Sequence, residues 1–451
     1  MTQGIARRPH PARRAIAAAL LAVGAALGLA ACDSGGGDKP SSPVEPPAAR
    51  PAHSPPPRSF LERLIPPQGG VLPSARTPGE IRRLVARLPV ERKVAQLLMV
   101  GFDGQDASAP FFGTLKRVDL GGVVIQKRNY TGEASLTALT GAVANAVAGH
   151  GHEPPFVVAP QEGGEFSVFP DLPPKLAPGD YDNLADAAAD AARAARTLKR
   201  LGLNGVLAPD ADVGASAPDP LGPRSYSDDP AEVSRYAVAV VAAYRRARML
   251  SAPSHFPGIG AAAQPTDEGP TSVGLSMREL QRRDVRPFRA AIRAGAPAVL
   301  VGHASYAPDS FVVPASLSPA IETNLLRGGL GFRGIAITDD LQAGAIVAGN
   351  SVAKAAVQAV QAGADMVWIS APEADWRGAY DALLAAVRSR AIPLTRLNAA
   401  VTRIVTVKRE LGLRTRPRPA PVTPVPATPA APGTVPPAPT TPGGPGTPSP
   451  G

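Results

Sequence analysis

The sequence predicts a TIM barrel, a closed ring of eight parallel strands that alternate with helices. Three observations predict this fold. Short apolar runs recur eight times between residues 77 and 413, Ala-rich stretches with helical spacing lie between them, and polar residues follow most of the runs. An open doubly wound sheet would show the same alternation. No Gly-rich nucleotide-binding turn follows the first apolar run, so that alternative lacks its usual ligand site.

The eight apolar runs are four to six residues long and bounded by turn residues, which is typical of strands buried on both faces. In chain order they are residues 96–101, 122–126, 156–159, 205–208, 250–255, 298–302, 334–338 and 365–370. Helical spacing of alanines and larger apolar residues predicts the connecting helices. The clearest are residues 183–201, 230–249, 277–294 and 352–362.

Two adjacent carboxylates, Asp339 and Asp340, directly follow the seventh apolar run. Successive side chains of a strand point to opposite sides, so one carboxylate should face a pocket while the other braces the loop. An aspartate after a strand can also be the cap of the next helix. The pair therefore indicates a site only if other strands deliver polar groups to the same rim.

Other predicted strands do end in polar side chains. These are Arg128 after the second run, Glu162 after the third, Asp210 and Asp212 after the fourth, His255 in the fifth and His303 after the sixth. Barrel enzymes carry their chemistry at the carboxyl ends of the strands, so the pattern predicts a polar, sugar-sized site. Glu162 is expected to be structural and to bond loop amides, and His303 to be a packed rim residue. No spacing of His, Cys and carboxylates indicates a metal, and no cofactor is expected.

The first 31 residues resemble a bacterial export signal. Four arginines among residues 7–14 precede an apolar run, residues 15–31, that is short for a membrane span. The run ends at Leu29-Ala30-Ala31-Cys32, which resembles a lipobox, and Cys32 is the only cysteine. Lipidation would explain an unpaired cysteine in an exported protein. We therefore expect a lipoprotein on the outer face of the cell membrane, exported by the general or the twin-arginine route.

Segments of low complexity flank the predicted barrel of residues 77–413. Residues 32–76 are rich in Gly, Pro and Ser and are predicted to be a tether, and residues 414–451 a disordered Pro/Thr-rich tail. The net charge is +10, but four of these charges belong to the export signal. No long basic run with interleaved aromatics occurs, so nucleic acid is not an expected partner. A carbohydrate and, through the lipid, a membrane are expected, and the chain is expected to be a monomer.

Several motifs together resemble family 3 of the glycoside hydrolases, in its β-N-acetylhexosaminidase branch. They are residues 91–102, Gln161-Glu162-Gly163-Gly164, residues 204–212 and 224–230, His255-Phe256-Pro257-Gly258, Thr338-Asp339-Asp340-Leu341 and residues 401–413. In order and spacing they cover nearly all of the predicted barrel. The resemblance implies a TIM barrel that cleaves β-linked sugars with retention.

The resemblance also implies roles for individual residues. Asp339 matches the family nucleophile, and Arg224 and His255 match residues that hold the sugar. This branch uses an Asp-Ser-His loop as general acid/base. The corresponding loop, residues 265–270, keeps Asp267 but has Gly269 in place of the histidine. Asp267 or Glu268 would then have to supply the proton.

Four further positions depart from the family pattern. Pro160, Glu165, Ser254 and Ile259 stand where the family has Asp, Arg, Lys and His, respectively. Two functional hypotheses therefore remain. The first is a lipid-anchored retaining glycosidase that removes terminal β-linked N-acetylhexosamine, or a related sugar, from cell-envelope or environmental glycans. The second is a degenerate barrel that binds a glycan or a partner protein without turnover.

Overall fold

The computed structural model describes residues 78–215, 221–370 and 372–415. The predicted signal, Cys32, the predicted tether and all but two residues of the predicted tail lie outside the described residues. The two described tail residues contact the barrel: Thr415 donates its hydroxyl to Glu153 (3.0 Å), and Arg414 lies 3.9 Å from Glu80. Within the described ranges, no helix combines the length and apolarity needed to cross a membrane.

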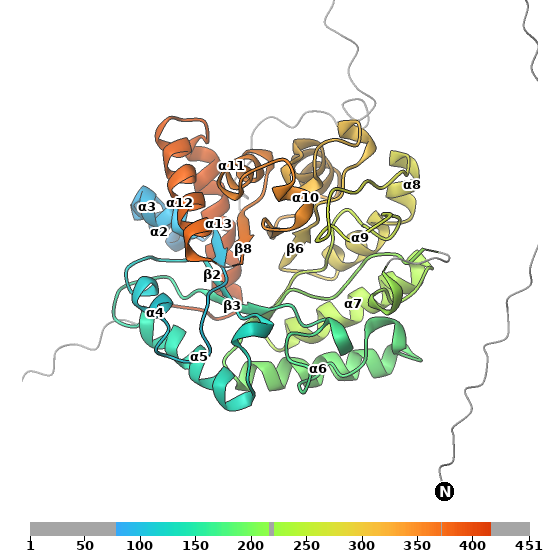
Figure 1. Ribbon diagram of the computed structural model, residues 1–451, viewed down its shortest axis with the longest axis horizontal. Coiled ribbons are helices and arrows are strands. Elements are labelled where there is room, and N and C mark those ends of the chain that lie inside the picture. Colours follow the sequence, from blue (N-terminus) through green and yellow to red (C-terminus); the bar gives the residue numbers. More distant parts are fainter. Residues whose placement is uncertain (1–77, 216–220, 371, 416–451) are drawn as a thin grey trace, which may run out of the picture. The chain divides into compact units, whose positions relative to one another are not determined.

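Eight parallel strands form one sheet in the order β5-β4-β3-β2-β1-β8-β7-β6 (Figure 1). They are β1 (Leu98–Val100), β2 (Gly122–Val124), β3 (Phe156–Ala159), β4 (Gly205–Val206), β5 (Leu250–Ser251), β6 (Ala298–Val301), β7 (Ile335–Asp340) and β8 (Met366–Ile369). Phe256, shortly after β5, pairs in parallel with Val301 of β6. This pairing joins the two ends of the sheet and closes the ring. The predicted barrel is confirmed, and every strand overlaps a predicted apolar run.

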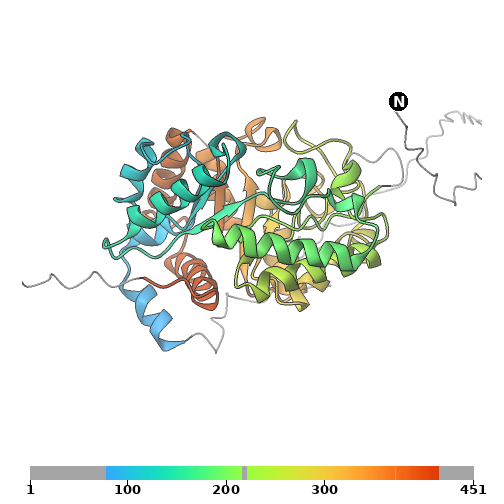
Figure 2. The ribbon, with the colours of Figure 1, turned by 90° about the horizontal axis from the view of Figure 1, so that it is seen from below.

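The main helices surround the sheet. They are α2 (Gly79–Arg87), α3 (Val90–Ala95), α4 (Pro110–Leu115), α5 (Glu133–Val147), α6 (Leu184–Arg200), α7 (Pro230–Arg246), α8 (Met277–Arg282), α9 (Val285–Arg293), the π-helix η7 (Ala320–Gly329), α10 (Gly344–Val347), α11 (Val352–Ala362), α12 (Glu373–Arg388) and α13 (Leu394–Glu410). Helices α6 and α7 pack side by side outside β4 and β5 (Figures 1 and 2).

Side-chain caps fix where three predicted helices begin. The side chain of Asn183 accepts from the amide of Asp186 at the start of α6, and Ser351 does the same for Lys354 at the start of α11. At α7 the carboxylate of Asp229 accepts from the amide of Ala231. Each cap satisfies an amide that has no partner inside the helix.

The predicted helix 277–294 is wrong in one respect, because it is two helices. The chain breaks at Arg283 and Asp284, between α8 and α9. Pro287 has no amide hydrogen and would remove a hydrogen bond from the interior of a continuous helix. In the observed structure it lies in the first turn of α9, where that bond is not needed.

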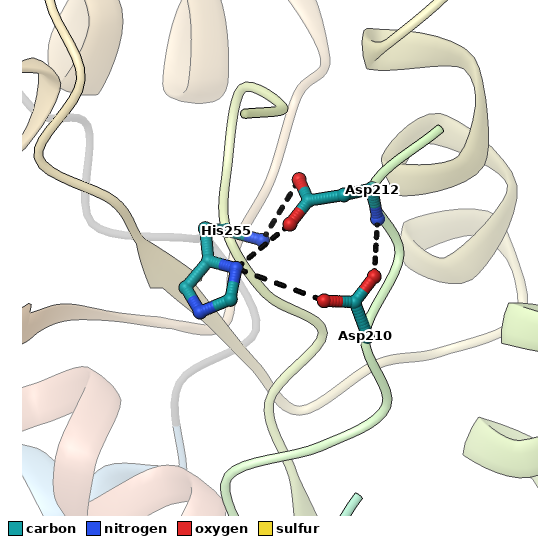
Figure 3. Close-up of side chains that lie close together, drawn as sticks. All are labelled: Asp210, Asp212 and His255. Atoms are coloured by element: carbon teal, nitrogen blue, oxygen red, sulfur yellow. Dashed lines mark hydrogen bonds and ion pairs between the residues drawn. The ribbon is translucent and has the colours of Figure 1, made fainter. Parts of the chain in front are cut away.

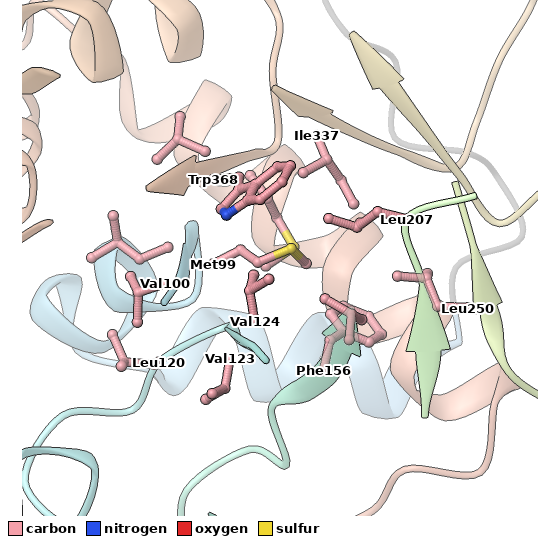
Figure 4. Packing of buried hydrophobic residues seen from close by; sticks show 14 of the residues in the cluster. Met99, Val100, Leu120, Val123, Val124, Phe156, Leu207, Leu250, Ile337 and Trp368 are labelled. Carbon is pink, nitrogen blue, oxygen red and sulfur yellow. The ribbon is translucent and has the colours of Figure 1, made fainter. Parts of the chain in front are cut away.

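Large apolar side chains fill the interior of the barrel. Met99, Phe156, Leu250, Ile337 and Trp368 come from five different strands and are buried against one another (Figure 4). The inward-pointing residues thus form a packed core below the polar rim, as in other barrels of this kind.

A buried ionic cluster lies at the amino-terminal end of β8. Asp365 pairs with Arg327 (2.6 Å), Arg396 (3.4 Å) and Arg403 (2.9 Å). Burial opposes ionisation of Asp365, but the three guanidinium groups outweigh it and hold its pKa below the ordinary value. Two of these arginines belong to α13, so the cluster ties this helix to the barrel. The nearby Glu322 of η7 is fully buried, and neither carboxyl oxygen has a hydrogen-bond partner in the described part of the chain.

Replacing Glu322 with methionine is expected to stabilise the protein, and more so as the pH rises. Burial raises the pKa of Glu322 from 4.5 to about 8. The folded state therefore holds a proton that the unfolded state releases, so this residue costs stability progressively between pH 4.5 and 8. With a penalty on the order of 2–4 kcal/mol at pH 8, the melting temperature of Glu322→Met should rise by roughly 5 °C or more there. The gain should shrink toward pH 4.5.

Thermal melts of both proteins across this pH range would test the prediction. Glu80→Met, at an exposed position of α2, is the control and should show no gain that grows with pH. A difference between Glu322→Met and the parent that is constant with pH would contradict the assigned ionisation.

Candidate active site

The two carboxylates at the end of β7 have different surroundings, as predicted. Asp340 is the bracing residue: its Oδ1 accepts from the amides of Gln342 (3.1 Å) and Ser370 (3.2 Å), and its Oδ2 accepts from the Ser370 hydroxyl. His303 supports the same end of β7. Its Nε2 donates to the Asp340 carbonyl (2.9 Å), and its Nδ1 contacts the Ser316 hydroxyl (2.8 Å). His303 is thus a packed rim residue, and the end of β7 is held from two sides.

Asp339 faces the interior of the rim. Its Oδ1 accepts from the amide of Asp340 (2.9 Å), and its Oδ2 lies 3.9 Å from Nε2 of His255. The residue is 8% exposed. A carboxylate held at the opening of a buried polar site is suited to attack an electrophilic carbon.

The side chain of His255 is oriented by Asp212 (Figure 3). Nδ1 of the ring lies 2.7 Å from Oδ2 of Asp212, and Oδ1 of Asp212 accepts from the backbone amides of Ile259 (2.9 Å) and His255 (3.3 Å). A ring that donates from Nδ1 leaves Nε2 available toward Asp339 and Arg224. The sequence indicates Asp212 only as a polar residue after the fourth strand, because its partner His255 is 43 residues away.

Arg224 is clamped by Glu162. Its Nε and Nη2 donate to the two carboxylate oxygens of Glu162, each at 2.7 Å, and Nη2 lies 3.1 Å from Nε2 of His255. The prediction that Glu162 bonds loop amides is therefore wrong, because its carboxylate is engaged in a fork-shaped ion pair. Burial would lower the pKa of Arg224, but Glu162 and Asp210 outweigh this effect and raise it. The guanidinium remains charged and fixed beside His255.

A third carboxylate, Asp210, is fully buried in the same cluster. Its Oδ1 accepts from the amide of Asp212 (2.9 Å), whereas its Oδ2 has no hydrogen-bond partner in the described residues and lies 3.6 Å from Nε of Arg224. Burial and the charges of Asp212 and Glu162 raise the pKa of Asp210 well above its ordinary value.

Asp210, Asp212 and His255 could together hold a metal ion, since one ligand atom of each lies within 4.8 Å of the others. No spacing in the sequence indicates this group, because His255 is 43 residues away from Asp212. The guanidinium of Arg224 already places a positive charge beside Asp210.

The loop of residues 265–270 lies next to the end of β7. Its backbone is hydrogen-bonded to the start of α10, where the amide of Gly344 donates to the Asp267 carbonyl (3.1 Å) and that of Ala345 to the Thr266 carbonyl (2.9 Å). The side chain of Asp267 is exposed, but the surrounding protein still reduces the hydration of its carboxyl group. This desolvation, together with the negative charge of Asp339, raises its pKa. A raised pKa is what a proton donor needs at neutral pH.

Glu268 is exposed, as Asp267 is, so exposure does not distinguish the two carboxylates. Gly269, in the place of the family histidine, is buried, and a side chain there would first meet Nε2 of Gln264 at 3.3 Å. The sequence offers both Asp267 and Glu268 as the proton donor. Asp267 is favoured, because desolvation and the charge of Asp339 raise its pKa.

Comparisons with known proteins agree with this geometry. The family model described as "Glycosyl hydrolase family 3 N terminal domain" matches residues 89–407. The chain belongs to glycoside hydrolase family 3. Membership assigns it to the glycosidases, which hydrolyse O-glycosyl bonds. Its TIM barrel is the fold that the resemblance implied.

Several β-hexosaminidases are similar to this family 3 chain. Beta-hexosaminidase LpqI of Mycobacterium tuberculosis is 32% identical over 408 residues, which cover 86% of this chain and 96% of LpqI. A beta-hexosaminidase of Xanthomonas oryzae pv. oryzae is 32% identical over 287 residues, which cover 61% of this chain and 84% of that protein.

Solved structures give the same picture. The family 3 β-N-acetylglucosaminidase of a Paenibacillus species superimposes with a TM-score of 0.69 at 31% identity, covering 72% of this chain and 63% of that chain. The structure of M. tuberculosis LpqI gives a TM-score of 0.65 at 29% identity, with coverage of 73% and 96%. This chain therefore spans less than two thirds of the Paenibacillus chain and nearly all of LpqI.

Proposed function

We propose that this family 3 member is a retaining glycosidase that removes terminal β-linked N-acetylhexosamine from cell-envelope or environmental glycans. One observation carries the proposal: a nearly buried carboxylate, Asp339, shares a polar rim with Asp267, a second carboxylate whose pKa is raised. Retaining glycosidases need such a pair, one group ionised and the other protonated. The names of the similar proteins, β-hexosaminidases, support the choice of sugar.

The reaction would proceed in two displacements. Asp339 attacks the anomeric carbon while Asp267 gives its proton to the departing oxygen, which leaves a glycosyl-enzyme ester and an ionised Asp267. Asp267 then takes a proton from a water molecule, whose oxygen attacks the same carbon and releases Asp339. Two inversions give net retention.

Arg224 and His255 would hold the sugar beside Asp339. Glu162 and Asp212 fix the two side chains in place through hydrogen bonds of 2.7 Å, so little conformational freedom remains to be lost on binding. From this fixed position the guanidinium of Arg224 would donate to a hydroxyl or an acetamido oxygen of the sugar.

A panel of aryl β-glycosides tests the proposal. N-acetyl-β-glucosaminide should be turned over fastest, and NMR should show the β-anomer as the first product. Preferred hydrolysis of a sugar without an acetamido group would contradict the assigned substrate. The α-anomer as first product would contradict retention.

The second candidate function is binding without turnover, and Gly269 is the observation that favours it. The family histidine is missing at this position, and loss of a general acid/base commonly costs about 10²–10⁴-fold in rate. Silence on every glycoside, together with measurable binding of a glycan, would favour this alternative.

We further propose that the mature protein is anchored to the outer face of the membrane through a lipid on Cys32. The lipobox-like Leu29-Ala30-Ala31-Cys32 supports it, and two or more acyl chains on one cysteine would anchor a protein stably. Cys32→Ala should appear in the medium or remain unprocessed. Unchanged partitioning of that variant into the detergent phase would contradict the anchor.

A further inference from the structure

We propose that Gly344 is a positioning residue that sets the place of Asp267 relative to Asp339. This inference rests on the proposed function, in which these two carboxylates act together. Nothing in the motifs of the sequence singles out Gly344. The evidence lies in how the loop of residues 265–270 attaches to the rest of the rim.

The loop is attached to α10 through its backbone. The amides of Gly344 and Ala345 donate to the carbonyls of Asp267 and Thr266. Gly344 follows Asp340 by four residues, and Asp340 is itself tied to Ser370 by hydrogen bonds. One short segment therefore carries Asp339 covalently and Asp267 by hydrogen bonds.

Close approach explains why residue 344 is glycine. A Cβ atom there would lie 2.7 Å from the Asp267 carbonyl oxygen, 2.8 Å from the carbonyl carbon of Glu268 and 2.9 Å from the Gly269 nitrogen. All three are backbone atoms, so no flexible side chain can move aside. Gly344 is not among the glycines with a left-handed backbone. Space alone, and not conformation, requires glycine here.

A side chain at this position would push the loop away from β7. Shifts of about 1 Å in a catalytic group can cost on the order of 100-fold in rate. The loss should fall on the step that needs the proton of Asp267. Attack by Asp339 should be spared, because the end of β7 is held independently by His303 and Ser370.

The test compares Gly344→Ala with Gly349→Ala, a matched change two residues after α10 where an added Cβ meets nothing within 4 Å. On an unactivated N-acetyl-β-glucosaminyl disaccharide, Gly344→Ala should lower kcat about 10- to 100-fold with little change in KM. On the dinitrophenyl glycoside, whose leaving group needs no proton, kcat/KM, which reports the first displacement, should change less than about threefold. Adding Asp267→Asn to Gly344→Ala should cost much less than Asp267→Asn alone. Gly349→Ala should match the parent.

A second variant guards against misfolding of the first. Ala345→Pro removes the amide that donates to the Thr266 carbonyl. It lies in the first turn of α10, where proline is tolerated, and it should show the same selective loss. Melting temperatures and hydrogen exchange of residues 264–270 would accompany the kinetics. Faster exchange in this loop is expected for both variants.

Two outcomes would overturn the inference, and they are distinguishable. If Asp267→Asn is impaired on the disaccharide but Gly344→Ala and Ala345→Pro are not, the attachment does not position the acid, and the proposed function stands. If Asp267→Asn is not impaired either, the assignment of the acid fails, and the positioning role fails with it.

Discussion

Asp339→Asn is expected to lower kcat on every glycoside by roughly 10³-fold or more. The substitution keeps the shape of the side chain but removes the charge that attacks the anomeric carbon. The main structural contact of Asp339 is a hydrogen bond from the amide of Asp340 to Oδ1, which an asparagine oxygen can also accept. Folding and melting temperature should therefore be almost unchanged. A fluorinated mechanism-based sugar should label Asp339 in the parent and leave the variant unlabelled.

The matched control is Asp381→Asn, the same change at an exposed position of α12. This variant should retain the parental rate and be labelled normally. Near-parental turnover by Asp339→Asn, or a label on a different carboxylate, would show that the nucleophile is another residue.

Asp267→Asn is expected to show a loss that depends on the leaving group. On an unactivated disaccharide, kcat should fall by about 10²–10⁴-fold, the usual contribution of a general acid. On a dinitrophenyl glycoside the first step should survive, because that leaving group departs without a proton. The second step then becomes slow, and added azide should restore turnover by attacking the glycosyl-enzyme without base catalysis.

The pH profile gives an independent measure of the same residue. Burial and Asp339 raise the pKa of Asp267, so the protonated form that the first step needs persists to higher pH than for an ordinary aspartate. Parental kcat/KM on the disaccharide should fall as the pH rises through this raised pKa. In Asp267→Asn this basic limb should disappear.

Glu268→Gln is the natural control, since it alters the neighbouring carboxylate of the same loop. Its rates and pH profile should match those of the parent. A selective loss in Glu268→Gln and none in Asp267→Asn would exchange the two roles. Brisk disaccharide hydrolysis by both variants would place the acid outside this loop.

The sequence predicted the barrel well because each strand carries its own local signal. A run such as Phe156–Ala159 is apolar throughout and bounded by turn residues, and β3 occupies this range. The division of labour between Asp339 and Asp340 was equally predictable, since the alternation of side chains along a strand is a local property. The break in the helix predicted over residues 277–294 is local as well, because it accommodates Pro287 in the first turn of α9.

The supports of the site could not be predicted in the same way. Glu162 reaches Arg224 across 62 residues, and Asp212 reaches His255 across 43. Which polar groups meet at a rim depends on the tilt of the strands and the paths of the loops, and these have no local signature. Gly344 shows the limit most clearly. A glycine near a helix start usually reflects local conformation, whereas here it accommodates a backbone that is 77 positions earlier in the chain.

The ionic cluster around Asp365 bears on how the protein is made. Two of its three arginines, Arg396 and Arg403, belong to α13, which follows all the strands in the chain. Until α13 has been synthesised, closure of the barrel would bury Asp365, which precedes β8, with most of its counter-charge missing, which is strongly unfavourable. The barrel should therefore close late, and chains terminated before Leu394 should stay open to proteases. Closure of the barrel would thus depend on the presence of α13.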